Sequence, residues 1–132
     1  MLLKEKPSNK RNAQRVKMLK KEVLRKKDDF NAIYKAGKSV PDRYVVLFCR
    51  KNDLAYSRTA FLASKKVGNS VQRNRAKRLM KESYRLNLDQ FCSGYDLIFI
   101  ARNTINGKKI RDVEKSLMNA AARGKVTVHD SK

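Results

Sequence analysis

The chain has 132 residues, of which 41% are hydrophobic, so it is long enough and apolar enough to form one domain with a core of its own. It carries 33 Lys and Arg residues against 12 Asp and Glu, a formal net charge of +21. This much like charge is self-repulsive on a small fold unless a polyanion neutralises it. The composition therefore predicts a nucleic acid as the partner.

Neither a membrane nor an oxidising compartment is indicated. No stretch approaches the roughly 20 apolar residues of a spanning helix, and the polar N-terminus lacks the apolar segment of a secretory signal. Cys49 and Cys92 lie far apart in apolar surroundings, without the spacing of a zinc site, and we expect both to be buried and reduced. We predict a cytoplasmic protein that binds no membrane.

The N-terminal segment, residues 1–20, is polar and basic. We interpret it as a mobile arm that adds phosphate contacts, although a solvated tail with no role is the alternative. Residues 21–124 are predicted to form the nucleic-acid-binding domain, and residues 125–132 a short C-terminal tail.

The first half of the domain is predicted to contain one short helix and two strands. Asp28-Asp29 supplies a cap and a negative first turn for a helix that Gly37 ends. The β-branched and aromatic run Tyr44–Cys49 is typical of a buried strand. A turn then leads to a second strand from about Arg58 to Lys65.

The second half is predicted to contain two longer helices around a third strand. Asn69 or Ser70 can cap a helix that extends to about Leu88, and the apolar run YDLIFIA (95–101) predicts the third strand. Residues 108–123 have the periodicity of a final amphipathic helix that stops at Gly124. The predicted fold class is α+β, with the order α-β-β-α-β-α and helices packed on one small sheet.

The helix after Asn69 separates into two faces. Ala76, Leu79, Met80, Ser83 and Leu86 form an arc that can pack on the sheet, whereas the opposite side carries a row of cations: Arg73, Lys77, Lys81 and Arg85, with Asn74 and Arg78 beside them. Glu82 is the only acid nearby. A merely soluble helix usually mixes charge signs, so this pattern favours a polyanion-binding face, with a solvated face as the alternative. Lys65 and Lys66, just before the helix N-terminus, suit phosphate binding.

The segment SKKVGNSVQRNRAKRLMKES (64–83) resembles the RNR motif of the bacterial ribonuclease P protein family. The matching positions follow one another in the family's order: Lys65, Lys66, Gly68, Asn69, Arg73, Asn74, Arg75, Lys77, Arg78 and Lys81-Glu82. Weaker similarity extends over most of residues 24–122. Ala60 stands where the family usually has glycine, and Ala76 where a larger aliphatic residue is common; both positions concern packing.

The resemblance implies an α/β sandwich with a left-handed crossover between parallel strands. It also implies two RNA-facing surfaces. The first contacts the catalytic RNA through Lys65, Lys66, Asn69, Arg73, Asn74, Arg75, Lys77, Arg78, Lys81 and Arg85. The second is a cleft for the 5′ leader of precursor tRNA, to which Phe30, Tyr34 and Phe48 are assigned. Aromatic rings beside cations stack on unpaired bases, although Phe30 and Phe48 could equally be core residues.

The implied activity is hydrolysis of a phosphodiester in precursor tRNA by an RNA-based endoribonuclease, with this chain as its non-catalytic protein subunit. Mg²⁺ would be held mainly by the RNA, and no second protein would be required. The sequence offers no catalytic set of its own, since His129 is the only histidine and the carboxylates are scattered over caps and turns. The alternatives are a ribosomal protein or RNA chaperone, a protein-only nuclease, and a DNA-packaging protein.

Overall fold

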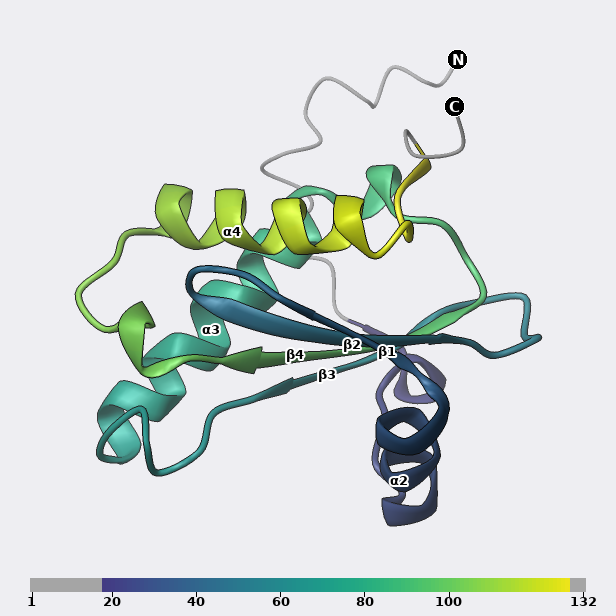
Figure 1. Cartoon of the computed structure of the whole chain (residues 1–132), viewed down its shortest axis with the longest axis horizontal. Helices are drawn as coiled ribbons and strands as arrows, with labels where there is room; N and C mark the ends of the chain where they lie inside the picture. Colours follow the sequence, from purple (N-terminus) through teal and green to yellow (C-terminus); the bar gives the residue numbers. More distant parts are fainter. Residues whose placement is uncertain (1–17, 129–132) are drawn as a thin grey trace.

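Four strands form one mixed sheet in the order β1-β2-β4-β3 (Figure 1). The computed structural model describes residues 18–128. The strands are β1 (Lys38–Pro41), β2 (Val45–Lys51), β3 (Arg58–Leu62) and β4 (Tyr95–Ala101). Within residues 18–128 the helices are α2 (Lys27–Ala36), α3 (Ser70–Leu86) and α4 (Ile110–Arg123), with short 3₁₀ turns η2 (Lys20–Glu22), η3 (Leu88–Gln90) and η4 (Asn103–Ile105). The mixed α+β class predicted from the sequence is confirmed.

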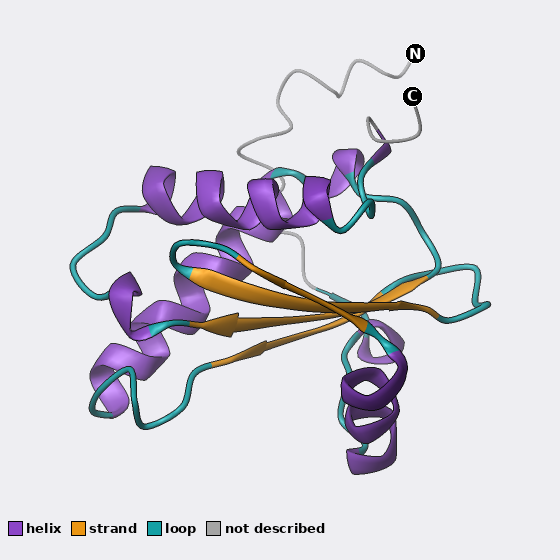
Figure 2. Cartoon of the chain, viewed as in Figure 1, coloured by secondary structure: helices purple, strands orange, loops and turns teal. Residues whose placement is uncertain are grey.

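The central strand β4 pairs antiparallel with β2 and parallel with β3. Parallel neighbours need a long crossover connection, and α3 provides it between β3 and β4 (Figure 2). The crossover predicted from the resemblance is therefore present, and its handedness stays a prediction.

Helices α3 and α4 cover one face of the sheet and enclose the main core. Because side chains alternate along a strand, every second residue of β2 and β4 points to this face, including the fully buried Leu47 and Phe99. Tyr84 of α3 packs on Phe99 at a ring-centroid distance of 5.8 Å, and burial raises its pKa to about 12. The periodicity argument did not place Tyr84 on the buried face of α3, whereas it placed Ala76, Met80 and Ser83 there correctly.

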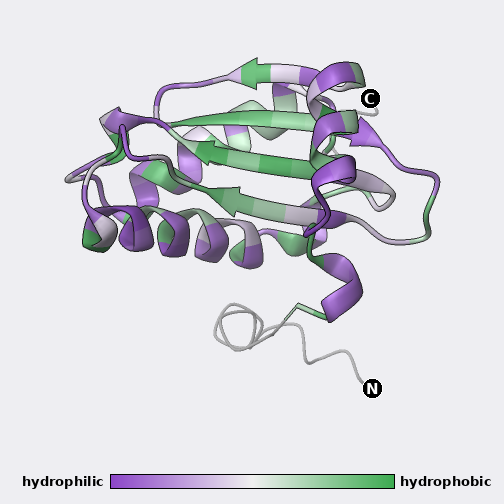
Figure 3. Ribbon diagram, turned by 90° about the horizontal axis from the view of Figure 1, so that it is seen from below, coloured by the Kyte–Doolittle hydropathy of each residue, from purple (hydrophilic) through white to green (hydrophobic). Residues whose placement is uncertain are grey.

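Among residues 18–128, α2 and the segment that leads into it cover part of the opposite face, and α2 crosses one end of the sheet (Figure 3). Leu24, Ile33, Ala60 and Ile98 are buried there, but Phe30, Phe48, Leu62 and Ile100 are only partly covered. This face therefore exposes apolar and aromatic surface that a monomeric domain would ordinarily bury.

The N-terminus of α3 is fixed by a reciprocal cap. The Asn69 side chain accepts a hydrogen bond from the Gln72 backbone N–H at 2.9 Å, and Gln72 Oε1 accepts one from the Asn69 N–H at 2.9 Å. Gly68 precedes the cap at a φ of +144°, and a Cβ there would lie 1.9 Å from Gln72 Oε1. The backbone conformation therefore favours glycine at this position, and an added Cβ would displace the Gln72 side chain from its cap.

Asp42, in the turn between β1 and β2, anchors α4. Its Oδ2 accepts a hydrogen bond from Ser116 Oγ at 2.6 Å, and its Oδ1 forms an ion pair with Arg123. Burial pushes the pKa of Asp42 upward, but hydrogen bonds from Ser116, Arg43 and Arg123 outweigh burial and lower the pKa below its ordinary value.

Several sequence predictions are corrected. The predicted order lacks β1, whose four residues contain only one buried side chain, Val40, too few for a periodic signal. The strand predicted from about Arg58 to Lys65 is β3, and it ends at Leu62. Helix α3 ends at Leu86, and α4 begins at Ile110. Lys26, and not an aspartate, is the N-cap residue of α2.

The predicted ends of the domain also change. Cys92, near the C-terminal segment, was predicted to be buried and is only half-buried. Val126 is fully buried and its carbonyl accepts a hydrogen bond from the Cys92 N–H at 2.8 Å, so the domain continues past residue 124. The predicted arm lies outside the described residues except for its last three, of which Met18 packs against the main core.

Candidate nucleic-acid interface

The polar side of α3 forms one wall of a groove of about 540 Å³. This groove, called the α3 groove below, has an apolar floor along β3, and its other wall comes from the segment that leads into α2. Its lining residues are Met18, Val23, Leu24, Phe30, Thr59, Ala60, Phe61, Leu62, Asn74, Lys77, Arg78 and Lys81. The structure thus brings together four of the predicted RNA-contact residues of α3 and one aromatic residue of the predicted leader cleft.

The cations of this wall have no carboxylate partner within residues 18–128. All three ion pairs in that part of the chain lie elsewhere, as Arg58–Asp29, Arg58–Asp96 and Arg123–Asp42. Lys81 and Arg78 are exposed and Lys77 is half-buried. Their charges therefore remain available to an external anion, for which RNA phosphates are the natural match.

Two predicted contact residues already have protein partners. Arg73 Nη1 donates to the Gly68 carbonyl at 2.8 Å, and Arg75 Nη2 donates to the Lys108 carbonyl at 2.7 Å. Each bond ends on a neutral carbonyl, so it orients the side chain and leaves its positive charge uncompensated. Arg85 does not reach the α3 groove; it lines a separate hollow of about 260 Å³ beside Tyr56 and Leu88, where its Nε is buried without a hydrogen-bond partner.

The turn before α3 carries two lysines, and a hydrogen bond from another loop holds its backbone in place. Lys65 and Lys66 are exposed. The Val67 carbonyl accepts a hydrogen bond from Asn106 Nδ2 at 2.6 Å, which ties the turn to the η4 loop. The Asn69 side chain is engaged in the helix cap, so its first role here is structural.

The three residues predicted for the leader cleft do cluster on the open face of the sheet. Tyr34 lies between the other two, with ring centroids 6.4 Å from Phe30 and 5.0 Å from Phe48. Its side chain is 40% exposed, and desolvation raises its pKa. Phe30 and Phe48 are half-buried, so they are neither pure core nor pure surface. Because Phe30 also lines the α3 groove, the aromatic cluster and the groove form one continuous surface.

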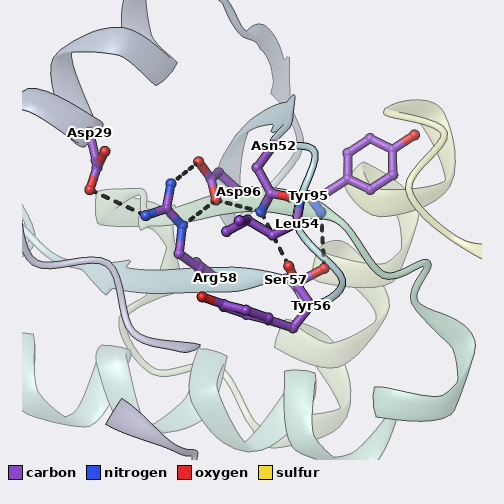
Figure 4. Close-up of polar contacts among 8 residues, drawn as sticks. All are labelled: Asp29, Asn52, Leu54, Tyr56, Ser57, Arg58, Tyr95 and Asp96. Atoms are coloured by element: carbon purple, nitrogen blue, oxygen red, sulfur yellow. Dashed lines mark hydrogen bonds and ion pairs between the residues drawn. The ribbon is translucent and has the colours of Figure 1, made fainter. Parts of the chain in front are cut away.

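A partly buried ion-pair network at the end of the sheet was not predicted from the sequence (Figure 4). Arg58 donates to both carboxylate oxygens of Asp96, at 2.8 and 2.7 Å, and Asn52 Nδ2 donates to the same carboxylate at 2.8 Å. Arg58 Nη1 also reaches Asp29 Oδ2 at 3.3 Å. The hydrogen bonds to Asp96 raise the pKa of Arg58 above its ordinary value. The one sequence signal was an acid, Asp96, inside an otherwise apolar strand.

The described residues offer no metal centre, since within 18–128 no three His, Cys, Asp or Glu side chains gather in a way that could hold an ion. His129 lies outside the described residues. Over the same range, no helix combines the length and the apolar character needed to cross a membrane.

Comparison with known proteins gives a consistent result. Residues 18–125 match the family model described as Ribonuclease P. A ribonuclease P protein component from Clostridium botulinum is 50% identical over 102 residues, which cover 76% of this chain and 92% of the relative. One from Clostridioides difficile is 42% identical over 106 residues, covering 80% and 93%.

Solved structures agree in fold as well as in sequence. A Staphylococcus aureus RNase P protein matches with a TM-score of 0.73 and 31% identity, over 80% of this chain and 96% of that one. The Thermotoga maritima RNase P protein matches with a TM-score of 0.68 and 33% identity, over 74% and 93%. With the basic helix, its capped turn and the open aromatic face in place, these matches show that the chain belongs to the ribonuclease P protein family.

Proposed function

We propose that this ribonuclease P protein subunit binds two RNAs through adjoining surfaces. The first surface, formed by the 64–69 turn and the polar side of α3, contacts the catalytic RNA. The second, formed by the aromatic cluster of Phe30, Tyr34 and Phe48 on the open face of the sheet, binds the single-stranded 5′ leader of precursor tRNA. The observation that carries the proposal is the α3 groove, where unpaired cations face an apolar floor that continues into the aromatic cluster.

Each surface suits the RNA assigned to it. Base–aromatic stacking contributes about 1–3 kcal/mol per base and tolerates any sequence, because every base has a π face. Stacking could therefore hold a leader of any sequence, which is what a subunit serving many different precursors requires. The cations of α3 neutralise backbone phosphates of the catalytic RNA and release counterions.

The protein contributes binding rather than the cleavage chemistry. A Mg²⁺ ion held by the protein would need a set of free carboxylate or carbonyl oxygens. Asp29 and Asp96 are both bound to Arg58, and the described residues gather no other acidic cluster. Among residues 18–128, the side chains do not fit a protein-held Mg²⁺, and we propose that the RNA subunit holds the metal. The chain orients the substrate and screens the repulsion between two RNAs, and needs no second protein to do so.

Cleavage of a precursor tRNA by a bacterial ribonuclease P RNA at limiting Mg²⁺ tests this proposal. The chain alone should be inert, and adding it to the RNA should restore cleavage at the mature 5′ end. The assembled enzyme should bind the precursor more tightly than mature tRNA. Cleavage without any RNA would revive the protein-only nuclease, and equal affinity for precursor and mature tRNA would remove the leader from the account.

A further inference from the structure

We propose that Arg58 is a positioning residue for leader binding, because it ties the first turn of α2 to the sheet and thereby fixes the aromatic cluster of Phe30, Tyr34 and Phe48. This inference rests on the proposed function of that cluster. Arg58 touches neither the catalytic RNA nor the leader in this account. It acts through the orientation of α2.

The two ends of α2 are held very differently. At the C-terminal end, Gly37 sits so close to the backbone that a Cβ would lie 2.5 Å from the Ile33 oxygen and 2.8 Å from the Cys49 oxygen. That end continues directly into β1 and has little room to shift. Ile33 is the only fully buried residue of the helix, so the N-terminal half is held by few apolar contacts.

At the N-terminal end, polar contacts with β3 add to the partial packing of Phe30 against Ala60 and its neighbours. Leu24, three residues before the helix, donates its N–H to the Thr59 carbonyl at 2.9 Å. Asp29, in the first turn, pairs with Arg58 at 3.3 Å. The position of the Arg58 guanidinium is fixed because its other nitrogens donate to Asp96, whose side chain is only 3% exposed.

Phe30 follows Asp29 directly and Tyr34 lies one turn further along, while Phe48 lies on the sheet. If the first turn of α2 moves, the two helix rings move relative to Phe48, and stacking depends on their separation. The Arg58–Asp29 pair is partly exposed, with side chains 23% and 32% accessible, so it contributes little to global stability. It can nevertheless bias the angle of a helix that is otherwise lightly held.

The chain supplies a matched control. Asp28 and Asp29 both lie in the first turn of α2, so Asp→Asn at either position removes the same charge and the same interaction with the helix dipole. Only Asp29 reaches Arg58. Asp29→Glu keeps the charge and can restore the pair.

The test measures the affinity of the assembled holoenzyme for precursor tRNA and for mature tRNA, and takes their ratio. Asp29→Asn should lower this ratio by roughly threefold, the scale of a partly exposed ion pair, while Asp28→Asn leaves it unchanged and Asp29→Glu recovers most of it. Affinity for the catalytic RNA should stay the same in all three. Equal behaviour of Asp29→Asn and Asp28→Asn would overturn the inference.

Phe48→Ala, measured in parallel, distinguishes the leader-binding role of the aromatic cluster from the positioning role of Arg58. If Phe48→Ala lowers the ratio and Asp29→Asn does not, the leader cleft stands and the positioning role of Arg58 fails. If Phe48→Ala also leaves the ratio unchanged, the leader cleft itself is misplaced and the proposed function fails with it.

Discussion

Replacing Lys77 by alanine should weaken assembly with the catalytic RNA and reduce its dependence on salt. Lys77 lines the α3 groove and has no ion-pair partner among residues 18–128, so its charge is free to neutralise a phosphate. Each phosphate contact contributes about 0.9 to the slope of log K against log salt for duplex nucleic acid and about 0.7 for single strands. A fourfold rise in salt should therefore weaken the wild type about threefold more than the variant.

The assay is a titration of the catalytic RNA with the protein at several salt concentrations, without precursor tRNA. Lys115→Ala is the control, because Lys115 is an exposed lysine on α4 that lines a different hollow, beside Asp42 and Tyr44. The control should retain the wild-type slope. A Lys77→Ala slope equal to that of the wild type would refute the assignment of the α3 groove to RNA phosphates, even if the affinity itself fell.

Three further predictions concern the framework of the site. Gly68→Ala should lower the free energy of unfolding by about 2 kcal/mol in urea titrations, because the strained φ remains and Gln72 must give up its cap; an unchanged midpoint would contradict this. Asp96→Asn should cost about 2 kcal/mol by leaving Arg58 without its buried counter-charge, and stability equal to wild type would remove the network from the account. Because the pKa of Asp42 is lowered in the folded state, its carboxylate stabilises the fold above the ordinary carboxyl pKa of 3.8. This stabilisation is lost as the pH falls through the lower folded pKa. In Asp42→Asn, the free energy of unfolding should therefore depend less steeply on pH in acid.

Local patterns predicted the elements that carry a long, one-sided signal. The seven residues of β4 are apolar except for Asp96, and the predicted bounds of this strand are those of the structure. The N-cap of α3 could be narrowed to Asn69 or Ser70 because both precede a helical periodicity and follow a glycine, and the structure has Asn69 there. By contrast, β1 has one inward side chain and therefore gives no periodic signal. Tyr84 is buried in the core, but its polar hydroxyl kept it out of the predicted apolar face of α3.

Contacts between distant segments could not be predicted from local patterns. Arg58 and Asp96 are 38 residues apart, and Arg58 and Asp29 are 29 apart. Nothing in the vicinity of any of the three indicates its partner, because Arg58 meets Asp96 through the parallel pairing of β3 with β4 and meets Asp29 through the packing of α2. Arg85 was grouped with the other cations of α3 because of its i, i+4 spacing, but residues at that spacing rotate gradually around the helix, and Arg85 lines a separate hollow.

The clearest measurement compares two variants whose sites lie outside the α3 groove, one on each proposed surface. The double variant Lys65→Ala/Lys66→Ala removes two exposed cations of the turn before α3, and Phe48→Ala removes the ring on the sheet. In a reconstituted holoenzyme, the lysine variant should weaken assembly with the catalytic RNA and leave the precursor-to-mature affinity ratio intact. Phe48→Ala should lower that ratio and leave assembly intact. If each variant changes both quantities equally, the chain does not bind its two RNAs through two distinct surfaces.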